Sequence, residues 1–468
     1  MTTTADPVPG GRPGDAERAT EQAVQLAEEL AGQDVHGVVL SWIDTAGIDR
    51  VKTVPVSRLA SAARWGVGMS PVFDTFLADD SIVATDVLGG PDGDLRLYPD
   101  LDELVPLAGQ PGWAWAPVDR ITQDGAVHPA CTRTLLRHLV SAAAADGVTF
   151  QAGIEIEFAL ALPGGVAFEP ACRGPAYGMT RLVEQSEFSA ELLRALTAEG
   201  IEVDQFHPEY AAGQYEVSVG AVNPVSAADH SVLVRQTIRA VAQRHGLRVS
   251  FAPAVLAGGV GNGGHLHLSA WRDGRDLHAG GDGRLGMTAD AEGFLAGIVE
   301  QLPALAALLT PSPSSYLRMQ PSHWAGVFAA WGHENREAGV RVVTGSVGQR
   351  DRTANLEVKC VDLAANPYLA FTGVLAAGLD GMRRGLRPGP PVVGDPAGLD
   401  PAELAERGIR RLPGSLADAL VPFEKSGLLR EALGDVLADA VLAVRRGEQA
   451  RAEQLTPEGI AEAYRWVY

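Results

Sequence analysis

Short stretches in which polar residues alternate with apolar ones mark the middle of the chain. Residues 151–160, QAGIEIEFAL, alternate isoleucine and phenylalanine with Glu155 and Glu157. Residues two apart on a strand share a face, so both carboxylates point away from the apolar side chains. Their mutual repulsion would be relieved by a divalent cation. The stretch taken alone also fits an amphipathic strand with one solvated face.

Three further stretches place polar pairs in the same way. The pairs are His265 and His267 in HLHLSAW, Glu357 and Lys359 in NLEVKCVD, and Glu209 and Glu216, which bracket a turn in HPEYAAGQYEVS. A single histidine or glutamate on a strand is usually structural or solvated, but four such segments together indicate a site. Five carboxylates and one histidine are enough for two oxygen-rich cation sites. This donor set favours Mg²⁺ or Mn²⁺ over zinc.

Arginines lie between the histidine pair and Glu357. Arg318 is in SYLRMQPSHW, and Arg336 and Arg341 are in ENREAGVRV. The planar guanidinium suits carboxylate and phosphate, and two cations with several arginines are typical of a phosphoryl-transfer site. The chain has no GxxxxGK[ST] motif, so it is not a P-loop enzyme. Surface ion pairing is the alternative interpretation of each arginine.

The same patterns predict an α+β protein with a small mixed N-terminal part and a larger part in which helices alternate with strands. Helices are expected over residues 19–33, 132–146, 189–199, 227–245, 292–310, 367–384 and 416–442. Strands are expected over residues 37–44, 50–56, 81–87, 93–99, 113–119, 151–160, 201–210, 213–220, 248–255, 265–271 and 355–362. We divide the chain into a disordered tail over residues 1–18, an N-terminal domain over 19–120 and a larger domain over 121–468.

Composition narrows the class of protein. The chain has 468 residues, 46% of them apolar, and a net charge of −20, which argues against nucleic acid or an anionic membrane as partner. The three cysteines are widely spaced, which suits a reducing cytoplasm. The first 18 residues lack the apolar core of a signal peptide, and the most apolar segment, residues 368–379, is too short to span a bilayer. We therefore expect a cytoplasmic location.

With these residues in view, the chain resembles the glutamine synthetase family over nearly its whole length. The resemblance rests on GIEIEF, HPEYAAGQYEV, GNGGHLHLS, SYLR, ENREAGVR and LEVKCVDLAANPYLAF, whose order and spacing match the family. It implies an N-terminal β-grasp domain and a catalytic domain with a curved antiparallel sheet flanked by helices. It also implies stacked rings of subunits, usually dodecamers, with active sites formed between neighbours.

The resemblance implies a reaction and a role for each polar residue. The γ-carboxylate of an acid would take the γ-phosphate of ATP, and an amine would then displace phosphate. The metal nearest the acid would be bound by Glu157, Glu209 and Glu216, and the metal on the ATP phosphates by Glu155, His265 and Glu357. His267 and Ser269 would lie along the nucleotide, Arg336 and Arg341 would stabilise the transferring phosphoryl group of ATP, and Arg318 would hold the acid with Gly261 beside it.

Departures from the family pattern fall on the ammonia side. In the family, PG, an aromatic and Glu-Ala-Pro follow the SYxR arginine, and this Glu binds ammonium and takes its proton. Here the segment reads PSHWAG, with Trp324 at the Glu position. The family's second ammonium ligand is the Asp of FDGSS, whereas this chain reads GVGMSPVFD, with Ser70 or its neighbour in its place and Asp74 displaced. Loss of both acids favours a changed nucleophile.

Two departures affect the acid side. The family's Asn-Gly before the histidine pair becomes Val260-Gly261, and the Arg after the last metal ligand becomes Lys359, a point charge instead of a fork. The acid is therefore glutamate held differently or a related acid. Residues 394–413 lack the Tyr that some family members have adenylylated, so we do not expect that regulation.

Our first hypothesis is therefore an ATP-dependent ligase that joins the γ-carboxyl of glutamate, or a similar acid, to an organic amine. Trp324 could stack on an aromatic amine or hold a cationic polyamine by a cation–π contact. The alternatives are an ordinary ammonia-using synthetase and a non-catalytic ring with a structural or regulatory role.

Overall fold

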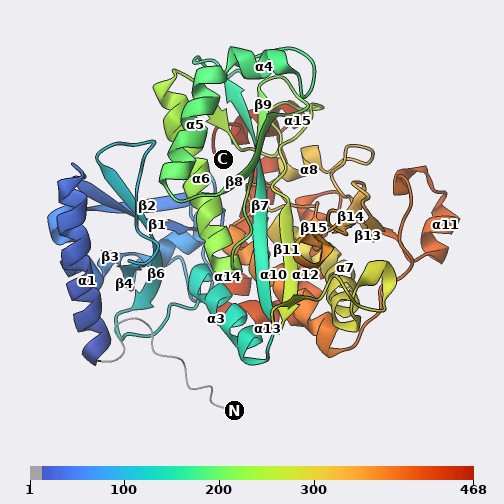
Figure 1. The fold of residues 1–468 in the computed structure, drawn as a ribbon, viewed down its shortest axis with the longest axis horizontal. Helices are drawn as coiled ribbons and strands as arrows, with labels where there is room; N and C mark the ends of the chain where they lie inside the picture. Colours follow the sequence, from blue (N-terminus) through green and yellow to red (C-terminus); the bar gives the residue numbers. More distant parts are fainter. Residues whose placement is uncertain (1–12) are drawn as a thin grey trace.

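The computed structural model describes residues 13–468, which form two β-sheets wrapped by helices (Figure 1). The N-terminal sheet has the strand order β2-β1-β6-β4-β3, with β5 beside β6. The larger sheet has the order β16-β13-β14-β15-β11-β7-β9-β8, with β10 beside β7 and β12 beside β11. Figure 1 shows the N-terminal sheet at one end, with α1 outside it, and β7 near the middle of the molecule.

The N-terminal elements follow the expected pattern with two exceptions. They are α1 (Pro13–Gly32), β1 (Gly37–Ile43), β2 (Asp49–Pro55), η1 (Val56–Arg58), α2 (Leu59–Trp65), β3 (Val67–Met69), η2 (Pro71–Thr75), β4 (Leu95–Pro99), β5 (Val105–Pro106) and β6 (Trp113–Thr122). Helix α1 begins within the expected tail, and the rest of that tail, residues 1–12, lies outside the described residues. The strand expected over residues 81–87 is wrong: Ile82 makes one bridge to Phe76 and is 54% exposed, so no neighbouring strand buries an apolar face.

The larger part contains the remaining strands and helices. Its strands are β7 (Thr149–Ala161), β8 (Val203–Pro208), β9 (Gln214–Val219), β10 (Arg248–Ser250), β11 (Leu266–Arg272), β12 (Arg275–Asp276), β13 (Phe328–His333), β14 (Ala338–Val343), β15 (Asn355–Val358) and β16 (Arg410–Arg411). Its helices are α3 (Thr132–Ala145), α4 (Met179–Glu184), α5 (Ser186–Ala198), α6 (Pro224–Arg244), η3 (Arg284–Gly286), α7 (Ala289–Leu309), α8 (Ser315–Arg318), α9 (Arg350–Thr353), α10 (Pro367–Arg383), η4 (Pro396–Gly398), α11 (Pro401–Glu406), α12 (Leu416–Lys425), α13 (Gly427–Leu433), α14 (Asp435–Ala452) and α15 (Pro457–Tyr464).

The α+β class expected from the sequence is confirmed, and the curled larger sheet differs from the expectation at one pairing. Its strand pairs are antiparallel except β13 and β14, which run parallel. The connection between them, residues 334–337, is polar. In the N-terminal sheet β1 pairs in parallel with β6, while its other pairs are antiparallel.

Helices α7 and α10 form the centre of the core. A Cβ atom built on Gly381 of α10 would lie 2.1 Å from the carbonyl oxygen of Gly293 of α7, so the two backbones touch. Phe294 of α7 packs against Phe150 of β7, with ring centroids 5.9 Å apart. Within residues 13–468, α7 alone is long and apolar enough to cross a membrane, but 72% of that window is buried, as in a core helix.

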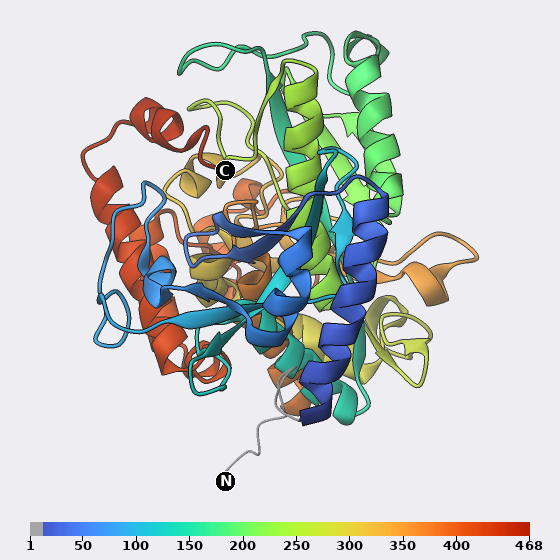
Figure 2. The same cartoon turned by 90° about the vertical axis from the view of Figure 1, so that its left-hand side faces the viewer.

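Buried backbone contacts hold the N-terminal sheet against the larger part. The side chain of Asn366 donates to the carbonyl oxygens of Ile43 and Asp44, at 3.3 and 3.1 Å. Arg445 of α14 donates to the carbonyl oxygen of Thr45 at 2.9 Å. Figure 2 shows α14 beside the N-terminal segments, although these segments are far from α14 in the sequence. The turn after β1 therefore fixes how the two sheets sit together.

We predict that Gly381→Ala destabilises the protein, because the new methyl group would overlap the backbone of α7. Overpacking of this kind costs roughly 1–3 kcal/mol. The matched control is Gly32→Ala at the end of α1, where nothing lies within 4 Å of the added Cβ. The control should be neutral or stabilising by up to about 1 kcal/mol. Urea unfolding of both variants measures the difference, and equal stabilities would contradict close packing of the two helices.

Candidate active site

The polar pairs expected from the sequence lie on or next to four neighbouring strands of the larger sheet, β15, β11, β7 and β9. His265 directly precedes β11, Lys359 directly follows β15, and Glu209 lies in the connection between β8 and β9. Glu157 of β7 lies opposite Glu216 of β9, and His267 of β11 lies opposite Glu357 of β15. The intervening residue Ile156 is fully buried in the core. The strand period thus separates an apolar face, packed on helices, from a polar face on which the site is built.

The first ligand group consists of Glu155, His265 and Glu357, each with a ligand atom within 4.8 Å of the others. Nδ1 of His265 lies 2.8 Å from Glu155 and 3.5 Å from Glu357. Burial and the nearby Lys359 ammonium lower the pKa of His265 to about 4. Burial alone would raise the pKa of Glu155, but its contacts with His265 and His267 outweigh this and lower it. The group therefore combines ionised carboxylates with a neutral imidazole.

The second ligand group consists of His207, Glu209 and Glu216, also within 4.8 Å of one another. Glu157, expected to share this metal, lies opposite Glu216 and faces the group: burial, and then the charge of Glu216, raise the pKa of Glu157 to about 8. The contact with Glu216 raises the pKa of His207. His207 was missed from the sequence, although it stands in the HPEY motif that places Glu209.

The two groups fit divalent cations. Their donors are mostly carboxylate oxygens, each with one imidazole, which is the set that hard cations accept. Burial, and then the charge of Glu216, make the ionised form of Glu157 unfavourable, and a bound cation would offset this electrostatic cost. The ligands proposed for two metals are therefore brought together, with His207 added and Glu157 between the groups.

Side chains around the ligands hold them in position. The amide of Gln214 donates to Glu157 Oε2 and to the carbonyl oxygen of Gly261, both at 3.0 Å. The hydroxyl of Tyr177 donates to Glu209 at 2.5 Å. A Cβ on Gly263 would lie 2.5 Å from His265 Nε2 and 2.8 Å from Glu157 Oε1, so a larger residue there would displace these ligand atoms. Gln214 and Tyr177 were missed, because neither has a charge or spacing that marks a ligand.

Three cationic side chains, all named from the sequence, contact the first ligand group. Arg318 is buried, with Nη2 3.2 Å from His265 Nε2, and a Cβ on Gly261 would contact its side chain. Lys359 donates to Glu357 at 2.9 Å, and Arg341 donates to the other oxygen of Glu357 at 2.9 Å.

Arg336 lies apart from these cations. It is exposed, and its guanidinium lies 5.9 Å from the ring centroid of Trp324. This side chain is therefore not brought to the ligand groups in this arrangement.

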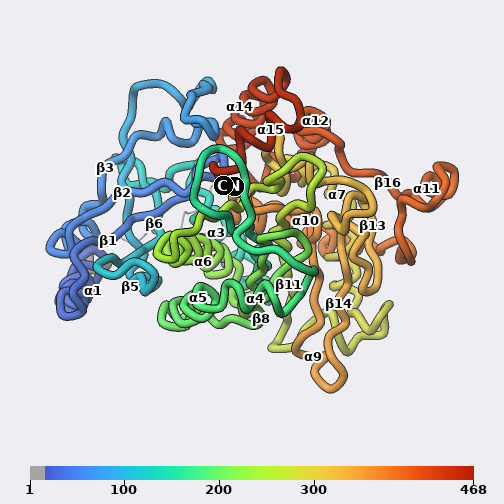
Figure 3. Tube along the Cα trace, turned by 90° about the horizontal axis from the view of Figure 1, so that it is seen from above, coloured from blue at the N-terminus to red at the C-terminus, as the bar shows by residue number. Residues whose placement is uncertain are grey.

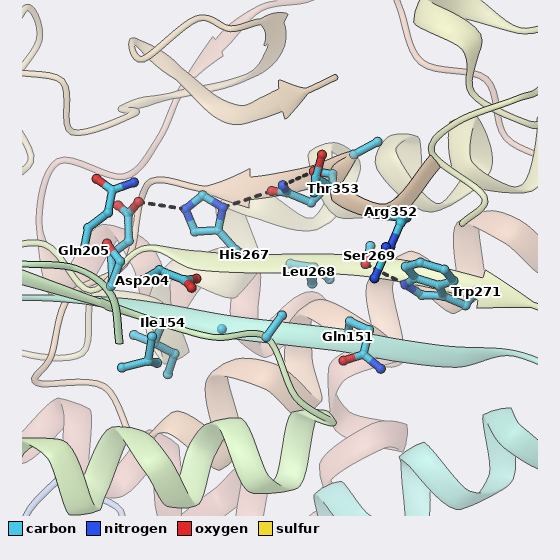
Figure 4. Close-up of a pocket in the computed structure, with 17 residues that line it drawn as sticks. Gln151, Ile154, Asp204, Gln205, His267, Leu268, Ser269, Trp271, Arg352 and Thr353 are labelled. Atoms are coloured by element: carbon cyan, nitrogen blue, oxygen red, sulfur yellow. Dashed lines mark hydrogen bonds and ion pairs between the residues drawn. The ribbon is translucent and has the colours of Figure 1, made fainter. Parts of the chain in front are cut away.

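A cavity of about 520 Å³ opens beside the first ligand group (Figure 4). His267 and Ser269, both expected along a nucleotide, line it. His267 stands between Glu155 and Asn355, at 3.1 and 2.9 Å, and Figure 4 shows Trp271 and Arg352 at the far end. Trp271 donates to Ser269 at 2.8 Å.

This cavity suits a nucleotide. At one end lie an aromatic and a cationic side chain, Trp271 and Arg352, and at the other lie His267 and the carboxylate of Glu155. Arg352 belongs to α9, in a loop that projects from the edge of the molecule (Figure 3). Trp271 and Arg352 were missed from the sequence, where nothing in their spacing links them to the ligand pairs.

The two positions expected to form the amine pocket lie apart within one chain. Trp324 is 58% exposed and precedes β13, whereas Ser70 follows β3, caps η2 and accepts the N–H of Val72 at 3.2 Å. Figure 1 shows β3 and β13 on opposite sides of the molecule. Asp74 is buried and bound by Arg120 at 2.7 Å, so its carboxylate is already paired. A single subunit therefore presents only the Trp324 side of such a pocket.

Comparisons with known proteins agree with this geometry. The family model for the glutamine synthetase catalytic domain matches residues 129–464. Gamma-glutamylpolyamine synthetase GlnA3 of Streptomyces coelicolor is 67% identical over 467 residues, covering 99% of each chain. Glutamine synthetase of Pyrococcus abyssi is 30% identical over 423 residues, covering 89% of this chain and 91% of that protein.

Solved structures show the same fold. A glutamine synthase homologue is 33% identical with a TM-score of 0.83, covering 93% of this chain and 99% of its own. GmaS in a complex with ADP is 29% identical with a TM-score of 0.81, covering 92% of this chain and 97% of its own.

We predict that Glu157→Gln removes cation binding at the second group without unfolding the protein. In the parent protein, Mg²⁺ or Mn²⁺ should raise Tm, because a ligand bound only by the folded state stabilises it. The variant should lose most of this rise and all turnover. Calorimetry in EDTA and in added cation measures the effect, with Glu187→Gln, an exposed carboxylate on α5, as control.

The pH dependence provides a second readout of the same variant. The folded-state pKa of Glu157, about 8, lies above its unfolded value, so its effect on stability becomes more unfavourable as pH rises toward 8. In EDTA at pH 8 the variant should therefore unfold at the same or a higher temperature than the parent. A full cation-induced rise in Tm, or full turnover, in Glu157→Gln would contradict the assignment.

Proposed function

Because the chain belongs to the glutamine synthetase family, we propose that it is an ATP-dependent ligase that joins the γ-carboxyl of glutamate to a primary amine of a polyamine. One observation supports a changed nucleophile most directly: both ligand groups are intact, while Trp324 stands where the family's ammonium-binding Glu is expected. The choice of a polyamine follows the name of the Streptomyces relative.

The residues of the site suit such a reaction in two steps. A γ-carboxylate oxygen attacks the γ-phosphorus of ATP and the bond to ADP breaks. The neutral amine nitrogen then attacks the acyl carbon, the bond from this carbon to the phosphate oxygen breaks, and the proton lost by the amine leaves with the phosphate. Divalent cations at the two ligand groups would neutralise charge on the acid and on the phosphates. Arg318 would hold the acid, Arg341 and Lys359 would face the transferring phosphoryl group, and the cavity beside His267 would bind the nucleotide.

We further propose that the working enzyme is a homo-oligomeric ring, a dodecamer as in the family, located in the cytoplasm. The separation of β3, which precedes Ser70, from β13, which follows Trp324, supports this, because a neighbouring subunit can bring the two residues together. In this proposal the β-grasp domain, residues 19–120, of one subunit completes the catalytic domain, residues 121–468, of the next.

We expect a polyamine to exceed ammonia in kcat/KM by at least about tenfold. Ammonia is mostly NH₄⁺ at neutral pH, and a missing general base typically costs about 10²- to 10⁴-fold. A polyamine also gains binding energy from its buried methylene chain, at roughly 25 cal/mol per Å². Phosphate release with ATP, glutamate and a panel of amines, ammonia included, measures the preference.

Trp324→Glu should narrow this preference, by improving the use of ammonia and weakening that of the polyamine. If ammonia proves the best substrate of the panel, the protein is an ordinary synthetase. If ATP is turned over but no amine of the panel is a substrate, the protein is not a glutamate–amine ligase. Complete absence of ATP turnover would favour a structural or regulatory ring.

We predict that activity requires assembly, because each site takes residues from two subunits. Sedimentation should place all polyamine-dependent activity in the oligomer. Rings co-assembled from two inactive chains, one with Glu157→Gln and one with Ser70→Trp, should regain activity at sites that receive neither change. A fully active monomer, or mixed rings with no recovery, would contradict a shared site.

A further inference from the structure

Glu337 places a buried carboxylate directly against Trp324. It precedes β14 and is only 7% exposed. Its Oε1 accepts the backbone N–H of Trp324 at 2.9 Å, whereas its buried Oε2 has no hydrogen-bond partner. Within residues 13–468 no lysine, arginine or histidine forms an ion pair with it. A buried carboxylate oxygen without a partner is costly, which points to a ligand that supplies one.

Contacts made by the turn at Trp324 connect Glu337 with the first ligand group. The turn that holds Trp324 has this residue at φ 55°, and Glu337 satisfies its N–H. In the same turn, a Cβ on Gly326 would lie 2.8 Å from the Cβ of Lys359. Lys359 in turn binds Glu357 of the first ligand group. Glu337 is therefore connected, through the turn that holds Trp324 and Gly326, to the lysine that binds the first ligand group.

The indole alone is a poor site for a second cation. The guanidinium of Arg336 already lies over the ring of Trp324, so an ammonium on that face would meet a like charge. A cavity of about 660 Å³ surrounds this pair and includes Glu334 and Glu337 among its lining residues. Glu334 is already paired with Arg341 at 2.6 Å. Of these two acids, Glu337 is the one without an ion-pair partner among the described residues.

We propose that Glu337 binds the distal ammonium of the polyamine, the amine group that does not react, while Trp324 covers the methylene chain. This assignment rests on the proposed function and adds to it the residue that distinguishes a diamine from a monoamine. The pairing is charge-assisted and gives Oε2 the partner it lacks. Pairing also offsets the desolvation of both charges when the amine enters the cavity.

The test compares 1,4-diaminobutane with butylamine, which has the same chain and no second ammonium. The parent enzyme should prefer the diamine. Glu337→Gln keeps an acceptor for the Trp324 N–H and should raise KM for the diamine at least about tenfold, because removing one partner of a buried charge pair is costly. In the same variant, KM for butylamine should stay within about threefold of its value in the parent enzyme, so the preference for the diamine over the monoamine should be lost. Glu337→Asp should retain part of it, and Glu187→Gln should retain all of it.

Three outcomes would overturn the assignment. If the parent enzyme uses 1,4-diaminobutane and butylamine equally well, it has no site for the distal ammonium. This outcome does not depend on whether any variant folds. An equal loss of kcat for both amines in Glu337→Gln indicates proton transfer or a structural role, and an unchanged preference leaves Glu337 without a part in recognition. Turnover with hydroxylamine, which is uncharged at neutral pH, shows that each variant is folded and active. Failure of the parent with every amine contradicts the proposed function itself.

Discussion

Repulsion among carboxylates on one face of the larger sheet is the constraint on which the site depends. The strand period places the acids together, and pairing between strands brings Glu157 opposite Glu216. The protein compensates the two groups differently. Lys359 and Arg341 neutralise Glu357, whereas burial and repulsion keep the pKa of Glu157 near 8. That difference makes the second group the one with most to gain from a bound cation.

The phosphoryl side and the amine side of the site are built from separate parts of the chain. Most of the ligands come from the centre of the sheet, where β7 lies between β11 and β9. The amine side comes from the turn at Trp324 and the polar connection before β14. A family can therefore change its nucleophile by substitution in the turn while the machinery for activating the acid stays in place.

Arg336 illustrates how the two parts are linked. Sequence resemblance assigns it to the phosphoryl group, yet here it lies over Trp324. In this arrangement the charge of Arg336 limits what the indole can hold and leaves Glu337 as the available anion. The neighbouring Arg341 remains on Glu357, so the two arginines of one motif serve different sides of the site.

The sequence by itself determined the fold class, most elements and all members of the two ligand groups except His207, because the two-residue period of a strand is local and needs no tertiary information. It also located Trp324, a substitution within a recognisable motif. Tertiary structure alone decided which side chains complete the site. His207, Gln214, Trp271 and Glu337 act through contacts between segments far apart in the chain, and such contacts leave no period in the sequence. For the same reason the pairing of Asp74 with Arg120, and the failure of residues 81–87 to form a strand, followed from which neighbours the fold provided.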